Sequence, residues 1–242
     1  MKVGMIQSNY IPWRGYFDFI DDCDLFVFYD DVQYTHRDWR NRNRIKTDRG
    51  PIWLSVPVIH DRQTLIQDAR IDYGSRWQDK HIRSLTLAYG KAQYFAAYAE
   101  GFFEHLRSRP ATISELNVRT CKWIMAQLGI RTRTRMSSDL GVAGEKEERP
   151  LRILQHLGAT SYLSGPTAKP YTDAEKYRSA GIALEFKVYD YPEYPQLHGA
   201  YDAHLTVLDL LFNCGPDARR YLKSRRPAEP ASFVQPEIGR NS

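Results

Sequence analysis

The residue types best suited to chemistry gather near the start of the chain, directly after two short apolar segments. Those segments span residues 3–6 and 25–29, and the side chains that follow them are amides, a phenol and carboxylates: Gln7, Asn9, Tyr10, Asp30 and Asp31. Such side chains contribute little to a hydrophobic core. The pattern therefore predicts a binding or catalytic site at the ends of two buried strands.

Asp30 and Asp31 are adjacent, so on an extended chain they point to opposite faces, and we expect one of them to reach a given ligand. A carboxylate at this position can bind Mg²⁺, accept a proton, or hold an amine or a sugar hydroxyl. The alternative is structural, because aspartate is common in the turn that ends a strand. Both interpretations remain open on the sequence.

A basic run follows, in which Arg40, Arg42 and Arg44 alternate with asparagines. In an extended chain these three guanidinium groups share one face, which suits a diphosphate or a row of carboxylates on the protein itself. A charged edge strand is the structural alternative. Because the run follows Asp30 and Asp31 closely, we favour an anion clamp formed by Arg40 and Arg42.

A third predicted strand, residues 161–163, ends in Ser164 and is followed by Lys169, Tyr171 and Asp173. Ligands of open parallel sheets bind outside the carboxyl ends of the strands. We therefore expect one pocket at this edge of the sheet. Its near side consists of Gln7, Asn9, Tyr10, Asp30, Asp31, Arg40 and Arg42, and its far wall consists of Ser164, Lys169, Tyr171 and Asp173.

Short apolar strands alternate with capped helices along most of the chain, which predicts an α/β fold with a mainly parallel sheet and helices on both faces. Three helical patterns between residues 74 and 129 indicate a helical insertion. The last of them begins at a capping box formed by Thr112 and Glu115. We expect a single domain over residues 1–226, followed by a disordered tail over 227–242.

Composition narrows the class of protein. The chain has 242 residues, 42% of them hydrophobic and 26% charged, and carries a net charge of +5. No stretch of about 18 apolar residues is present, and no signal peptide is evident. Three cysteines without metal spacing fit a reducing cytoplasm without disulfides. The sequence has neither a dinucleotide-binding glycine motif nor a phosphate-binding loop, so we expect no cofactor and no metal.

The motifs around these residues resemble the WbqC-like family of bacterial proteins. The matching motifs are QSNYIPWRGYFD from Gln7, DDVQY from Asp30, WRNRNRIK from Trp39, GATSYLSGP from Gly158, YPQ from Tyr194 and LDLLFNCG from Leu208. Ser8 departs from the proline that is usual in the family. The family also has a word like W-x-x-K-H, here Trp77, Lys80 and His81, which marks His81 as a candidate acid–base residue. His198, in the loop after YPQ, is a further candidate for substrate binding.

A second similarity concerns residues 12–16, which resemble the phosphate-binding motif P-x-H-x-G-H of the cytidylyltransferase-like fold and imply that layout for the N-terminal half. Both histidines of that motif are replaced, by Arg14 and Tyr16 when the glycines are aligned. Those histidines stabilise the pentavalent phosphorus of the transition state. Their replacement argues against nucleotidyl transfer and leaves other chemistry on the same layout open.

The WbqC-like resemblance implies a role in surface-polysaccharide (O-antigen) or natural-product biosynthesis. We favour a cytoplasmic transferase that moves an acyl or aminoacyl group, supplied on a carrier, to an amine or hydroxyl of a small anionic acceptor such as a nucleotide-linked sugar. Asp31, His81 or Asp30 would handle the proton. The alternatives are a non-catalytic partner in a biosynthetic complex and a nucleic-acid binder, the latter disfavoured because 29 acidic residues oppose 34 basic ones.

Overall fold

A six-stranded sheet forms the centre of the molecule. The computed structural model describes residues 1–144 and 148–231. The order of the strands across the sheet is β10-β9-β8-β1-β2-β7. Their bounds are Lys2–Ile6 (β1), Leu25–Phe28 (β2), Arg133–Met136 (β7), Ser161–Ser164 (β8), Ala183–Phe186 (β9) and Glu229–Pro230 (β10). All neighbouring strands are parallel except β10, which runs antiparallel to β9.

The register confirms that the apolar segments at the start of the chain and before Ser164 share one sheet. In it, Val3 pairs with Leu25 on one side of β1 and with Tyr162 on the other. From β1 the chain builds the sheet outward through β2 and β7, then crosses to β8 and β9 on the opposite side. The carboxyl ends of β1 and β8 therefore flank a reversal of strand order, the place where open α/β sheets bind ligands.

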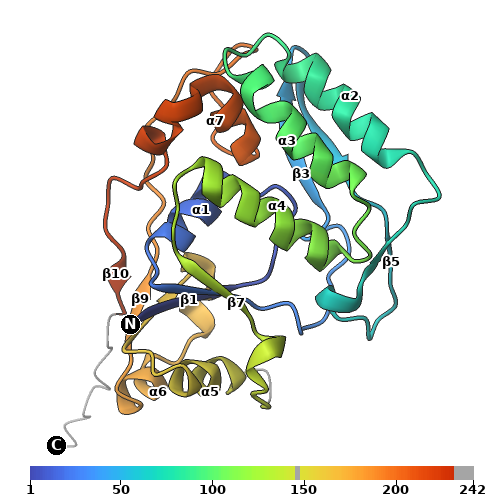
Figure 1. Cartoon of the computed structure of the whole chain (residues 1–242). Coiled ribbons are helices and arrows are strands. Elements are labelled where there is room, and N and C mark those ends of the chain that lie inside the picture. The colour runs from blue at the N-terminus through green and yellow to red at the C-terminus, as the bar shows by residue number, and fades with distance from the viewer. Residues whose placement is uncertain (145–147, 232–242) are drawn as a thin grey trace, which may run out of the picture.

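Helices cover both faces of the sheet, as Figure 1 shows. On one face lie α1 (Arg14–Asp21) and α4 (Ile113–Gln127), and on the other lie α5 (Arg149–His156) and α6 (Ala174–Ser179). Alternate residues of β2 explain the two layers, since Phe26 and Phe28 belong to the core on the α1 side while Val27 belongs to the core on the α5 side. The predicted α/β class with a mainly parallel sheet is thus confirmed.

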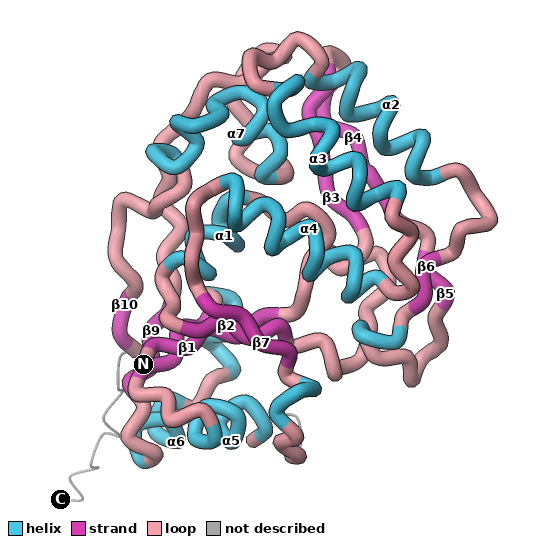
Figure 2. Tube along the Cα trace, in the orientation of Figure 1, coloured by secondary structure: helices cyan, strands magenta, loops and turns pink. Residues whose placement is uncertain are grey.

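A long excursion joins β2 to β7. It begins with two antiparallel hairpins, formed by β3 (Arg42–Thr47) with β4 (Gly50–Ser55) and by β5 (Val58–Ile59) with β6 (Arg70–Ile71). Then come α2 (Trp77–Tyr89), α3 (Phe95–Arg107) and α4, all within the segment for which a helical insertion was expected. The tube in Figure 2 shows both hairpins standing apart from the central sheet.

Caps and turns fix where the helices begin. Thr112 caps α4 by accepting a hydrogen bond from the Glu115 N–H at 3.2 Å, as expected. The Glu115 carboxylate, however, accepts from the Ala111 N–H at 2.9 Å and not from Thr112. At the far end of the chain, Thr206 caps α7 (Val207–Cys214), which is almost entirely buried.

Two expectations need correction. The tail was expected to be without structure from residue 227, but Glu229 and Pro230 pair with β9 as strand β10, while residues 232–242 lie outside the described residues. Arg40 was expected to extend the same strand face as Arg42 and Arg44. It instead lies in the turn before β3, so its side chain takes a different direction.

None of the described helices is both long and apolar enough to cross a membrane. The cysteines Cys23, Cys121 and Cys214 are buried and free.

Candidate functional site

A cavity of about 180 Å³ lies beyond the carboxyl end of β1, where the sheet topology places a ligand site. It is lined by residues from three parts of the chain: Asn9, Pro12, Trp13, Trp39, Asn43 and His204. Backbone hydrogen bonds hold these parts together. The Tyr10 N–H donates to the Trp39 carbonyl and the Val207 N–H to the Pro12 carbonyl, both at 2.9 Å, and the Thr206 N–H donates to the Arg44 carbonyl at 3.0 Å.

The Trp13 indole forms one wall of the cavity. It fits there because Gly15, two residues further along, has no side chain. A Cβ at Gly15 would lie 2.3 Å from Cζ2 of Trp13, closer than non-bonded atoms approach, so the indole occupies the space that any other residue would need. The rings of Tyr189 and Tyr191 meet the same indole edge-on, with centroids 5.0 and 5.7 Å away. Gly15 and the two tyrosines therefore fix the orientation of Trp13.

Trp39 forms a second wall and remains 45% exposed. Its ring lies 5.6 Å from that of Trp53, which is 46% exposed. The guanidinium groups of Arg42 and Arg44 lie over Trp53, at 4.4 and 5.8 Å from its ring centroid. Exposed indoles lose contact with water when a flat ligand covers them, so Trp39 provides a stacking surface at the cavity mouth.

Arg40 lies beside the cavity, where it joins two of the predicted residues. Its guanidinium donates to Oδ1 of Asn9 and, at 3.4 Å, to Oε1 of Gln7. Asp38 lies 3.6 Å from the same guanidinium and neutralises part of its charge. The structure thus brings Gln7, Asn9 and Arg40 together at the end of β1, as the sequence predicted.

Asp30 is fully buried. One carboxylate oxygen accepts the Ser8 N–H at 2.7 Å, and the other accepts the hydroxyl of Ser114 on α4. Asn117, also on α4, adds a second contact, because its side-chain amide donates a hydrogen bond to the Arg40 carbonyl at 2.8 Å. Asp30 therefore holds the loop after β1 against α4.

Asp31 forms a bidentate ion pair with Arg149, whose Nη1 lies 2.9 Å from Oδ1, and also accepts from Ser137. Burial alone would raise the pKa of Asp31. The hydrogen bonds from Arg149 and Ser137 outweigh it, so the pKa lies below its ordinary value and the carboxylate stays ionised at neutral pH.

Tyr10 and His81 form a buried pair. The Tyr10 hydroxyl lies 2.8 Å from Nδ1 of His81, and the two side chains are 0% and 4% exposed. Burial lowers the pKa of His81 to about 4, so the imidazole is neutral at neutral pH. This pair packs behind the turn that carries Trp39, and neither residue lines the 180 Å³ cavity.

The residues predicted for the far wall lie apart from this cavity, which none of the four lines. Ser164 is buried, Lys169 lies 3.8 Å from Glu229, Tyr171 is 90% exposed, and Asp173 caps α6. His198 also lies elsewhere, with Nε2 2.6 Å from the Ala88 carbonyl. Roles for these residues, and acid–base roles for Asp30, Asp31 and His81, stay predictions.

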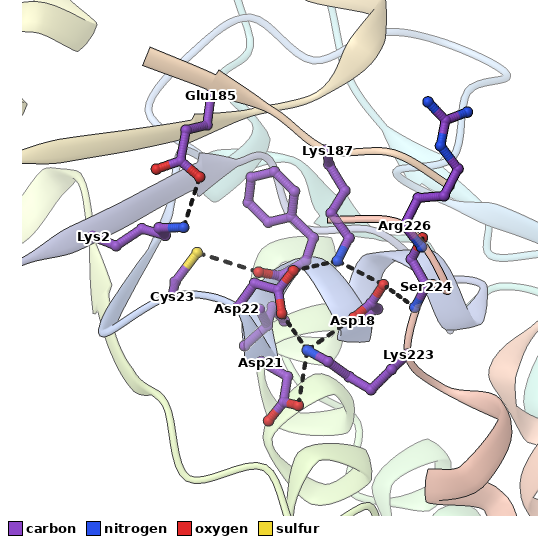
Figure 3. Close-up of polar contacts among 12 residues, drawn as sticks. Lys2, Asp18, Asp21, Asp22, Cys23, Glu185, Lys187, Lys223, Ser224 and Arg226 are labelled. Carbon is purple, nitrogen blue, oxygen red and sulfur yellow. Dashed lines mark hydrogen bonds and ion pairs between the residues drawn. The ribbon is translucent and has the colours of Figure 1, made fainter. Parts of the chain in front are cut away.

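A cluster of charged side chains surrounds Asp18, Asp21 and Asp22 at the C-terminal end of α1 (Figure 3). Asp18 of α1 is fully buried and receives Lys187 at 2.6 Å, Lys223 at 3.0 Å and the Tyr191 hydroxyl at 2.9 Å. Tyr191 is one of the rings that hold Trp13. The cluster therefore ties α1 to the C-terminal part of the chain and fixes one wall of the cavity.

Sequence reasoning did not assign Trp13, Asn43 or His204 to the site. A signal for Trp13 was available, since this residue lies two positions before a helical glycine, Gly15, within the family-like motif that begins at Gln7. Asn43 orders the loop after β1 by donating to the Ile11 carbonyl at 2.9 Å. His204 enters from a loop near the end of the chain, and no pattern around it marks the position.

The described residues include no group of three or more His, Cys, Asp or Glu side chains that could hold a metal ion. The cavity itself offers amide, indole and imidazole groups beside one guanidinium. Such a set suits an organic ligand with a ring and a negative charge better than it suits a cation.

Comparison with known proteins agrees with the resemblance seen in the sequence motifs. The chain is 43% identical over 229 residues to uncharacterized protein Rv1507c of Mycobacterium tuberculosis (strain ATCC 25618 / H37Rv), a match that covers 92% of this chain and 97% of that protein. No solved structure matches the chain, so the resemblance of its N-terminal half to the cytidylyltransferase-like fold stays a prediction. Residues 7–221 match the WbqC-like protein family, and the chain belongs to that family.

Proposed function

We propose that this protein is a cytoplasmic transferase that acts on an amine or hydroxyl of a small anionic acceptor, such as a nucleotide-linked sugar, in surface-polysaccharide or secondary-metabolite assembly. The observation that supports it is the pairing of an aromatic cavity with a guanidinium at the carboxyl end of β1. A ring and an anionic group in one small molecule would meet both features.

The size of the cavity limits what enters it. Pockets for drug-sized ligands measure about 300–1,000 Å³. A cavity of about 180 Å³ accommodates a single sugar or base ring between Trp13 and Trp39. The rest of a nucleotide-linked sugar would lie outside, along the exposed face of Trp39 and Trp53.

Arg40 would bind the anionic part of the acceptor. A guanidinium has five N–H donors, and the contacts to Asn9 and Gln7 leave donors available for a ligand. The contacts also hold the side chain in place before the ligand arrives. A clamp ordered in advance loses little entropy on binding and positions the acceptor for reaction.

His204 lines the cavity, and its imidazole can accept a proton at one ring nitrogen and return it. When the acceptor amine attacks an activated acyl carbon, a C–N bond forms, the bond from that carbon to the carrier breaks, and the amine loses a proton. His204 would accept this proton and return it to the departing carrier. Asp31 and His81, predicted for this role from the sequence, already have partners in Arg149 and Tyr10.

A binding screen tests the proposal. Purified protein is mixed with nucleoside diphosphate sugars, free nucleotides and sugar phosphates, and thermal unfolding is followed. A ligand at 100 times its Kd adds about 2.7 kcal/mol to the free energy of unfolding. We expect at least one nucleotide-linked sugar to raise the Tm, and no shift across the panel would refute the acceptor class.

Variants then locate the site. Trp39→Ala should weaken binding of the hit by roughly 5–150-fold, since stacking on an aromatic side chain contributes about 1–3 kcal/mol. Trp123→Ala, which removes an indole on α4 away from the cavity, is the matched control and should leave the Kd unchanged. Equal effects of the two substitutions would place the ligand elsewhere.

A further inference from the structure

A second cavity lies on the other side of the turn that carries Trp39 and Arg40. Its volume is about 380 Å³. The residues that line it come from the segment that leads into the first residue of β3 and from the end of β4 onward: Tyr34, His36, Arg37, Asn41, Arg42, Ser55, Val56, Pro57, Val58 and Asp72. Trp39 and Asn43 line the first cavity and Asn41 and Arg42 the second, so the same stretch of chain separates the two.

Basic side chains gather at this second cavity. Arg37 and Arg42 line it together with His36, whose Nδ1 lies 3.2 Å from Nε2 of His60. The His60 ring in turn packs on Tyr34, with centroids 4.8 Å apart. The acidic lining residue is Asp72, one of whose oxygens accepts the Gly74 N–H at 2.8 Å. The balance of charge favours an anion.

The backbone that presents these groups is strained. Arg37 has a φ of +56°, in the left-handed region that side chains other than glycine rarely adopt. Such conformations cost about 1–3 kcal/mol and persist where the surrounding structure imposes them, often at ligand sites. Here the strained residue is itself one of the arginines that line the cavity.

A donor without a partner lies in the same wall. The Tyr34 hydroxyl is buried and has no hydrogen-bond partner among the described residues. Burial raises the pKa of Tyr34 to about 12, so the hydroxyl keeps its proton at neutral pH and is available to donate. A buried donor that lacks a partner costs free energy, which an acceptor oxygen of a ligand would recover.

We propose that this second cavity binds a phosphate-bearing anion through Arg37, Arg42, His36 and the Tyr34 hydroxyl. Its oxygens would accept hydrogen bonds from the guanidinium groups and from Tyr34, with the paired imidazoles at the rim. The site does not depend on the function proposed for the first cavity, because neither Trp13 nor His204 lines it. Two anion sites on either side of one turn would hold two charged reactants close together, or would bind two parts of the same reactant.

Inorganic pyrophosphate is a suitable probe, followed by NMR of protein with ¹⁵N-labelled histidine at low ionic strength, where exposed charges are least screened. The chain has seven histidines, so His36 and His60 can be assigned by substituting each in turn. We expect both signals to shift saturably with pyrophosphate. Absence of a saturable shift would overturn the proposal.

Arg37→Gly is the decisive variant, because it removes the charge and relieves the strained backbone at the same time. It should weaken pyrophosphate binding at His36 and His60 about tenfold or more, the equivalent of one lost hydrogen bond to a charged group. Arg109→Gly makes the same change at another positive φ, +50°, outside the cavity, and should leave the Kd unchanged.

A Kd in Arg37→Gly equal to that of the wild type would also refute the site. If Arg37→Gly fails to fold, Arg37→Asn, which also tolerates a positive φ, takes its place with the same expected result. Trp13→Ala should leave the His36 and His60 shifts intact, and a loss of these shifts would show that pyrophosphate acts through the first cavity.

Discussion

The two ends of α1 are both crowded with functional groups but differ in how those groups are partnered. At the C-terminal end, Asp18, Asp21 and Asp22 face Lys187 and Lys223, and Asp18 and Lys187 are 0% and 2% exposed. At the N-terminal end, Trp13 borders an open cavity, and Arg40 alongside has donors to spare. The charged groups at the C-terminal end are therefore saturated with partners, and the groups at the N-terminal end are not.

This difference shows that a dense group of charges does not by itself identify a binding site. The Asp18 cluster satisfies its charges internally, and the hydrogen bonds from Lys187 and Lys223 lower the pKa of Asp22 despite its burial. Such a cluster has little left to offer a ligand. The cavity at the other end has fewer charges, but exposed indole surface and spare donors remain there. We therefore expect substitutions at the saturated end to change stability and substitutions at the open end to change binding.

The largest effect, a loss of stability, should come from removing an ion pair at the saturated C-terminal end of α1. Lys187→Met leaves Asp18 buried beside one fewer cation, and removing one partner of a buried ion pair costs about 3–5 kcal/mol. Urea unfolding should report this loss. The matched control is Lys169→Met at a half-exposed ion pair with Glu229, where we expect a change of about 0–1 kcal/mol. Equal losses in the two variants would contradict the comparison.

The next effect should appear at the open end, as a loss of binding. Gly15→Ala places a Cβ where the Trp13 ring lies, 2.3 Å from its Cζ2, and must displace the indole. Losing one stacking surface should weaken the ligand found in the nucleotide-sugar screen by about 1–3 kcal/mol, or roughly 5–150-fold. Isothermal titration measures the Kd.

Gly101→Ala is the control for that substitution, since it also adds a methyl group to a helical glycine beside a tryptophan, here at 3.0 Å from Trp123. It should leave the Kd unchanged. If Gly15→Ala binds the ligand as tightly as the wild type, Trp13 is not a wall of the binding site.

The sequence predicted the parts of this fold that depend on local pattern. Apolar runs located β1, β2 and β8, and Thr112 located the start of α4. It also predicted that Gln7, Asn9 and Arg40 meet, because residues after neighbouring parallel strands share one edge of a sheet and Arg40 follows Asp30 and Asp31 closely in the sequence. These inferences need only periodicity, capping and strand direction.

What it did not predict depends on contacts between distant segments. Arg149 lies far along the chain from Asp31, and Ser114 far from Asp30, so nothing local shows that both carboxylates already have partners. His204 reaches the cavity because Thr206 is hydrogen-bonded to the backbone of β3. The same limit explains β10, where a segment rich in proline and glutamate pairs with β9 at the edge of the sheet.

A smaller effect, visible through pH, should distinguish His81 from the residues of the open cavity. Burial holds the pKa of folded His81 near 4, against about 6.5 in an unfolded chain. Between these values the unfolded state binds more protons, so the free energy of unfolding falls as pH falls, by at most about 1.4 kcal/mol per unit. Above pH 6.5 the contribution is constant.

In His81→Gln this part of the slope should disappear. Chemical denaturation of both proteins at pH 7, 6 and 5 measures it, with the difference between them removing what other groups contribute. At pH 7 the variant should bind the ligand from the screen as the wild type does, because His81 pairs with Tyr10 and does not line the cavity. Lost binding at pH 7 in a folded variant would return His81 to the site, as the sequence suggested.

The smallest effect is expected at Tyr171, where sequence and structure differ most clearly. Its position after β8 predicted a place on the far wall of the site, yet its side chain is 90% exposed and does not line the cavity. An exposed side chain with few contacts contributes little to stability, so Tyr171→Ala should change the free energy of unfolding by less than about 0.5 kcal/mol. The Kd of the screened ligand should change less than about twofold, since a tenfold change needs about 1.4 kcal/mol. Tyr171→Phe separates the ring from the hydroxyl. If Tyr171→Ala weakens binding and Tyr171→Phe restores it, the exposed ring closes over a bound ligand. The binding site at the N-terminal end of α1 then includes the loop after β8.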